Sequence, residues 1–181
     1  MIIRRLLAVA VGIVAATVVA LAASNSTARL VSFPSAQTQA VARDGRFAVV
    51  NVDSDTEPHH TLLLENRQTK STRKILEYDR SVEVLWNPDS TVFAVNNYAG
   101  SNVGECLIFF TNKAASVNVG DVLQNGTTNR DEISTLHASD HIYWAAVRWM
   151  SPQLLKVKLW GHTDVSPYRD FQYYHTYKVR R

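Results

Sequence analysis

The sequence is poor in the residues that small proteins use for covalent crosslinks and for phosphate binding. It contains one cysteine, Cys106, so an intramolecular disulfide is excluded. It contains only seven glycines, and it lacks the P-loop, the Gly-x-Gly fingerprint and the G-x-S-x-G elbow of serine hydrolases. With 181 residues, 46% of them hydrophobic, the chain is long enough to form one domain with its own core. Because Cys106 lies in the apolar run 106–110, we predict a buried thiol rather than a nucleophile.

Acidic residues are absent from the first part of the chain, up to Asp44. Two of the 19 basic residues, Arg4 and Arg5, lie within the first 23 residues, and the others nearly balance the 16 acidic residues. Nucleic-acid-binding domains usually carry a clear excess of basic residues on one face. We therefore expect no nucleic-acid partner, and we interpret the short basic run 67–74 as a solvated turn.

Residues 1–23 have the pattern of an export segment. Arg4 and Arg5 precede a stretch, 6–23, that is apolar apart from Thr17, and the sequence 20–22 fits a small-x-small cleavage site. Eighteen helical residues span about 27 Å, close to the thickness of the bilayer's hydrocarbon core. The segment is thus either a cleaved signal peptide or an uncleaved anchor. In both cases the rest of the chain crosses the membrane, so we predict a periplasmic or secreted protein whose membrane contact is limited to residues 6–23, if they are retained.

The remaining chain divides into a tether and a strand-rich domain. Residues 24–42 are small and polar, include Pro34, and predict a tether. Residues 43–181 predict a mainly β domain, because short apolar or alternating runs recur along it: 47–52, 61–65, 72–78, 82–86, 91–95, 106–110, 143–149, 154–160 and 171–179. Continuous apolar runs such as 91–95 are typical of strands covered on both faces. Residues 112–141 interrupt this rhythm and predict a helical insertion, with helices starting near Gly120 and Arg130.

The last predicted strand, 171–179, places His175 in an aromatic row. Alternation puts Phe171, Tyr173, Tyr177 and Val179 on the same face as His175. We interpret His175 as a packed, hydrogen-bonded side chain rather than as a ligand.

One segment, Trp86-Asn87-Pro88-Asp89-Ser90-Thr91-Val92-Phe93-Ala94-Val95, carries a recognisable signature. It resembles the W-S-P-D-G-x-x-hydrophobic-A-hydrophobic segment of TolB-type β-propeller repeats. Two weaker copies occur at 43–49, which keeps the Asp-Gly turn, and at 149–157, which keeps the tryptophan and the proline. The resemblance implies that each copy forms a turn followed by an inner strand of a blade. The first two copies lie about 45 residues apart, a spacing that suits a four-stranded blade.

The chain has room for about three such units, whereas closed propellers have about four to eight blades. We therefore expect an antiparallel meander of three propeller-blade-like units, either an incomplete propeller or a sandwich. Association with other copies is one way to close it, but the sequence does not require this. The resemblance implies a protein-binding or structural scaffold more than an enzyme.

Polar side chains follow each of the three inner strands. If the units stack, the loops after these strands share one edge of the fold, which makes them the candidate binding site. The candidates are Asp53, Asp55, Asn97, Ser101, Asn102, His162 and Asp164.

We assign no catalytic residue, no metal site and no cofactor. The sharpest metal hypothesis would use His162 and Asp164 with Asp53 or Asp55, but scattered histidines and aspartates are also ordinary turn residues. The sequence therefore predicts an exported, non-enzymatic binding or structural module of the cell envelope, whose partner is another envelope or extracellular protein. The alternative is a hydrolase of envelope polymers that uses the Asp and His loop residues.

Overall fold

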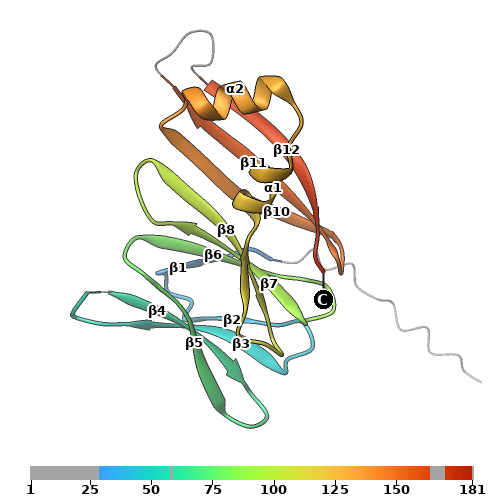
Figure 1. Cartoon of the computed structure of the whole chain (residues 1–181). Helices are drawn as coiled ribbons and strands as arrows, with labels where there is room; N and C mark the ends of the chain where they lie inside the picture. Colours follow the sequence, from blue (N-terminus) through green and yellow to red (C-terminus); the bar gives the residue numbers. More distant parts are fainter. Residues whose placement is uncertain (1–28, 58, 164–169, 181) are drawn as a thin grey trace, which may run out of the picture.

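A computed structural model describes residues 29–57, 59–163 and 170–180 of the chain. The predicted export segment 1–23 lies outside the described residues. Among the residues that are described, no helix is long and apolar enough to cross a membrane. The fold is mainly β, as predicted, and consists of three stacked sheet units (Figure 1).

The first unit is a four-stranded antiparallel meander in the order β2-β3-β4-β5. Its strands are β2 (Gln39–Val41), β3 (Phe47–Asp53), β4 (His60–Asn66) and β5 (Ser71–Tyr78). Along these strands alternate side chains point toward the second unit, among them Val49, Leu62 and Leu64, which are nearly fully buried. The period-2 pattern of apolar residues thus produces one buried face and one outward face.

The second unit is built around β7 (Val92–Tyr98), which is flanked by β6 and β8. Its other strands are β1 (Val31–Phe33), β6 (Ser81–Trp86), β8 (Val103–Phe110) and β9 (Ser116–Asn118). In β7, Phe93 and Val95 pack into the core shared with the first unit, whereas Val92 and Ala94 pack into the core shared with the third. This confirms that the continuous apolar run 91–95 is a strand covered on both faces.

The third unit consists of β10 (His141–Ser151), β11 (Leu154–His162) and β12 (Asp170–Lys178). β10 pairs in parallel with β8 only at Ile142 and Tyr143 and then leaves that edge. Farther along, Trp149 of β10 packs into the core shared with the second unit and donates its indole N–H to the carbonyl of Leu85. The third sheet therefore stacks on the second, as neighbouring blades do in a propeller. The described strands form no closed sheet.

Two helices pack on the inner face of the third unit, inside the predicted insertion. They are α1 (Val119–Gly126) and α2 (Arg130–Ala138). Each begins at an asparagine whose side chain accepts hydrogen bonds from the first free backbone N–H groups, Asn118 for α1 and Asn129 for α2. Gly120 permits α1 to approach the sheet closely, because a Cβ at this position would lie 2.7 Å from the Trp144 ring.

The prediction of a tether at 24–42 is wrong for its second half, because β1 and β2 lie within that segment. β1 pairs with the edge strand β6, and β2 completes the first unit beside β3. Phe33 and Ala40 are each about 1% exposed, so this segment belongs to the core. Strands of three residues are too short to show a recognisable alternation among small polar neighbours, which is why the pattern predicted a linker.

Candidate functional site

The three loops predicted to form a site lie along one edge of the stack. β3 ends at Asp53, β7 leads into the loop 99–102, and β11 ends at His162. In Figure 1 the β3–β4 and β7–β8 connections both lie on the left side, at successive heights of the stack. The described ends of these strands thus follow one another along the units, one at each level of the stack.

Asp53 belongs to a polar network at the end of the first unit. Its carboxylate accepts a hydrogen bond from Asn51 Nδ2 at 2.7 Å and lies 2.7 Å from His60 Nδ1. The bond to His60 is the main reason why the pKa of Asp53 lies below its usual value. The His60 ring stacks on Tyr78, whose hydroxyl donates to Asn51 Oδ1 at 2.6 Å. Asp55 lies beyond this network, exposed in the β3–β4 turn.

Asn97 is not a loop residue, contrary to the prediction. It lies within β7, is 6% exposed, and donates from Nδ2 to Glu105 Oε2 at 3.0 Å. The apolar run ends at Val95, but the backbone ladder with β6 and β8 continues past it, so the strand extends through Tyr98. Backbone pairing, which does not depend on side-chain polarity, decided this boundary.

Ser101 and Asn102 do lie in an exposed loop, and their backbone carbonyls hold the third unit. The carbonyl of Ser101 accepts from the Tyr143 hydroxyl, and that of Asn102 accepts from the Ile142 N–H at 3.0 Å. This loop therefore joins the second unit to the start of β10.

His162 stacks face to face on His141, with ring centroids 3.9 Å apart. The two residues are cross-strand partners in β10 and β11, and His141 Nδ1 lies 2.9 Å from Asp140 Oδ1. The bond to His141 is the first cause of a lowered Asp140 pKa. No group of three or more metal-ligating side chains occurs in the part of the chain that the structure describes. Asp164, the remaining candidate, lies outside the described residues.

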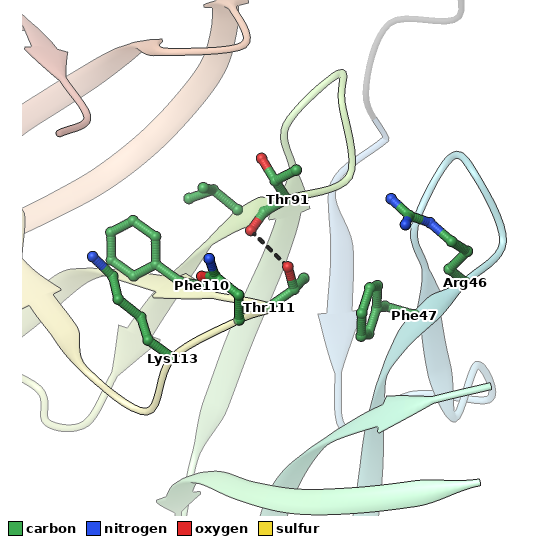
Figure 2. A pocket seen from close by; sticks show the side chains of 8 residues that line it. Arg46, Phe47, Thr91, Phe110, Thr111 and Lys113 are labelled. Carbon is green, nitrogen blue, oxygen red and sulfur yellow. Dashed lines mark hydrogen bonds between the residues drawn. The ribbon is translucent and has the colours of Figure 1, made fainter. Parts of the chain in front are cut away.

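A hollow of about 390 Å³ lies at the opposite edge, between the first and second units (Figure 2). Its lining is Arg46, Phe47, Thr91, Val92, Phe110, Thr111, Asn112 and Lys113. Both cations already have partners: Arg46 Nε binds Asp44 at 2.6 Å, and Lys113 Nζ lies 3.9 Å from the centre of the Phe110 ring. The hydroxyl of Thr111 donates to the Thr91 carbonyl. Sequence reasoning missed this hollow because its walls come from three separate strand ends.

Glu132, on the buried side of α2, lies against His175 of β12. Glu132 is 2% exposed, and its Oε1 lies 3.2 Å from His175 Nε2. Neither atom makes a hydrogen bond of good geometry to the residues described. His175 is packed as predicted, 5.4 Å from the Trp144 ring, but its Nε2 lacks the predicted hydrogen bond and faces a carboxylate from the helical insertion. Strand periodicity could not reveal this partner, because Glu132 lies in a helix outside the strand pattern.

The outer face of the third unit is defined as the side of β10–β12 turned away from the second unit, and it exposes large apolar side chains. Three of its large apolar side chains are about half exposed: Val147 at 44%, Met150 at 47% and Tyr174 at 51%. The Tyr143 and Trp160 rings stack beside them with centroids 5.4 Å apart.

Basic side chains frame this aromatic surface. Lys158 Nζ lies 4.9 Å above the Trp160 ring, and Lys156 Nζ lies 4.3 Å above the Tyr174 ring. Arg148 and Lys178 extend the same side of the sheet and are exposed. Trp, Tyr and Arg are the residues most often found at the energetic centres of protein interfaces. Sequence reasoning did not recognise this face.

No known family matches the sequence, and no curated protein is similar to it. Among solved structures, the chain is similar to the β-propeller domain of the Trilobed protease from Pyrococcus furiosus, which has an open velcro topology. The TM-score is 0.52 at 14% identity, over 80% of this chain but only 41% of that one. The chain thus spans less than half the length of the propeller that it matches. At this identity the likeness shows the fold alone: this chain has a β-propeller-like fold.

Proposed function

We propose that this chain is an exported, non-enzymatic binding module of the cell envelope, which binds a partner protein through the outer face of its third unit. One observation carries the proposal: this face exposes Val147, Met150 and Tyr174 among stacked aromatic rings, whereas the inner faces of the three units are buried. A cluster of half-exposed apolar side chains rimmed by cations is typical of an interaction surface.

Two features of the sequence support the location. The pair Arg4-Arg5 before the apolar stretch 6–23 is the pattern of an export segment, either cleaved or retained. The segment Trp86–Val95 resembles TolB-type repeats, which supports a scaffold role at the envelope rather than catalysis. The proposal requires no cofactor and no metal.

The test is thiol labelling in intact cells with a reagent that does not cross the inner membrane. The full chain is expressed with either Tyr174→Cys, on the outer face, or Val122→Cys, which is 47% exposed on α1 and serves as the matched control. The native thiol of Cys106 is fully buried and contributes little background.

We expect Val122→Cys to react in intact cells and Tyr174→Cys to react much more slowly, because the partner covers it. Both variants should react equally after purification and dilution. Labelling of Val122→Cys only after lysis of the inner membrane would overturn the location, and equal labelling of the two variants in intact cells would overturn the binding face.

A further inference from the structure

The turns that precede β3 and β7 have the same backbone geometry. In the first, Ala42 N–H donates to Phe47 O, Gly45 N–H donates to Ala42 O, and φ of Gly45 is 72°. In the second, Asn87 N–H donates to Val92 O, Ser90 N–H donates to Asn87 O, and φ of Ser90 is 61°. Because each hydrogen bond of the first turn has a counterpart in the second, Ala42 and Asn87 occupy equivalent positions, and so do Ala40 and Leu85.

Because of this equivalence, the contact between the first and second units and the contact between the second and third units are of the same kind. The indole N–H of Trp86 donates to the carbonyl of Ala40 at 2.8 Å, and the indole N–H of Trp149 donates to the carbonyl of Leu85 at 3.0 Å. Each unit therefore docks in the same orientation, with the side that carries its tryptophan packed against the opposite side of the unit before it. Such head-to-tail stacking does not terminate itself, since each added unit presents a fresh outer face of the same kind.

The stack ends with two unlike outer faces. On the third unit, the face carries the aromatic and aliphatic side chains described above, with Lys156, Lys158, Lys178 and Arg148 and the single acid Asp170. On the first unit, the outward side chains of β2–β5 include Val41 at 42% exposure and Val52 at 45%, together with Leu63 and Val50. The charged residues there are Glu65, Glu77 and Lys74. Lys74 is paired with Glu77 at 2.8 Å, and Glu65 lies 3.8 Å from Lys70 in the adjoining turn.

We propose that the partner on the outer face of the third unit is the first unit of a second copy of this chain, so that two copies close a ring of six units. This inference rests on the proposed function, because it names the partner of the same face. It continues the stacking already present between the three units of one chain. Two copies would supply twice three units, within the range of about four to eight that closes a propeller.

Charge favours this arrangement over a symmetric pairing of like faces. Two third-unit faces packed together would oppose Lys156, Lys158 and Lys178 with their own copies, and like charges across an interface are costly. The first-unit face instead offers apolar side chains together with Glu65 and Glu77, each paired with a lysine of the same unit, so it brings no excess of positive charge against the basic rim. The contact is thus predicted to be heterologous: the third unit of one copy meets the first unit of the other.

The test is crosslinking between two differently tagged full chains with a short bis-maleimide, in mild detergent. One carries Val52→Cys on the first-unit face and the other carries Tyr174→Cys on the third-unit face. We expect crosslinks in the mixture at about tenfold the level given by either variant with Val122→Cys, the yield expected for contact rather than collision. Either variant alone should give only the control level.

Sedimentation provides the second measurement. The unaltered chain should have the mass of two copies, Tyr174→Glu should shift it to one copy, and Val122→Glu should leave it unchanged. Crosslinks between two Tyr174→Cys chains, or a single-copy mass for the unaltered chain at micromolar concentration, would overturn the inference. A single-copy mass together with protection of Tyr174→Cys in cells would retain the proposed function with a different partner.

Discussion

The carboxamide of Asn96 bonds both backbone groups of Ala146. Asn96 Nδ2 donates to the Ala146 carbonyl at 3.1 Å, and the Ala146 N–H donates to Asn96 Oδ1 at 2.6 Å. The side chain of one residue in β7 thereby imitates a strand neighbour for β10, at a place where β10 has left the edge of β8. Asn96 is 1% exposed and Ala146 is 4% exposed, so these bonds satisfy backbone groups that are shielded from water.

Replacing Asn96 with Ala should therefore destabilise the fold by about 2–4 kcal/mol, because it leaves two buried backbone groups and the Glu83 carboxylate short of partners. Asn96→Asp should be at least as damaging, since its second oxygen would face the Ala146 carbonyl. Urea denaturation monitored by tryptophan fluorescence measures the unfolding free energy of both variants. Asn102→Ala, in an exposed loop, is the control. A loss from Asn96→Ala no larger than that of the control would contradict this role.

The two interunit indole bonds should have similar energies, because they are equivalent contacts. Trp86→Phe and Trp149→Phe each keep an aromatic ring but leave the carbonyl of Ala40 or of Leu85 without its donor, and each should cost about 1–3 kcal/mol. Trp160→Phe, on the outer face, should cost clearly less. Unfolding free energies of the three variants provide the comparison, and a negligible effect of Trp149→Phe alone would show that the contacts are not equivalent.

Gly120 and Gly126 should respond oppositely to alanine. A Cβ on Gly120 would lie 2.7 Å from Trp144 Cδ1, so Gly120→Ala should destabilise the protein by about 1–3 kcal/mol through overpacking. A Cβ on Gly126 would meet no neighbouring atom within 4 Å, so Gly126→Ala should be neutral or slightly stabilising. Thermal unfolding of both variants tests this contrast.

The Asp53–His60 bond should make stability depend on acid pH. The folded-state pKa of Asp53 is lowered below 3.8, mainly by this hydrogen bond, so its contribution is complete above the unfolded-state pKa and is lost as the pH falls through the folded-state pKa. Asp53→Asn should lower stability at pH 6, and the difference from the unaltered chain should shrink below pH 3.8. Because Asp53 is exposed, the effect should be small. A difference in unfolding free energy between Asp53→Asn and the unaltered chain that does not change with pH would contradict this role of the Asp53–His60 bond.

The thiol of Cys106 should be inert in the folded protein. Burial raises its pKa to about 12, and its side chain is 0% exposed. Thiol reagents at pH 8 should modify it only at the rate at which the protein unfolds, and promptly in denaturant. Rapid modification of the native chain would show that the core between the second and third units opens readily.

Short-range patterns in the sequence were sufficient for most of the strands. The run 91–95 could be assigned to a doubly covered strand because all of its residues after Thr91 are apolar, and the row of 171–179 could be assigned to one face because alternation is a local property. The helices were predictable near Gly120 and Arg130, where the strand rhythm stops. β1 and β2 were missed because three-residue strands among small polar residues have too little pattern.

The candidate site was less accessible from the sequence. Placing Asp53, Ser101 and His162 near one edge required only that the units repeat. Whether these residues meet depends on the spacing between stacked sheets. The outer face of the third unit, the hollow near Arg46 and the pair Glu132–His175 each combine segments far apart in the chain, and a local pattern cannot reveal such combinations.

The sequence by itself determined the mainly β composition, the repeated turn-and-strand motif and the burial of Cys106, because these follow from the polarity of neighbouring residues and the period of a strand. Only the tertiary structure decided that Trp86 and Trp149 make the same bond, that Asn96 holds β10, and that two unlike sheet faces remain open. Those features depend on how the sheets stack, and stacking is set by packing between distant segments rather than by any stretch of sequence.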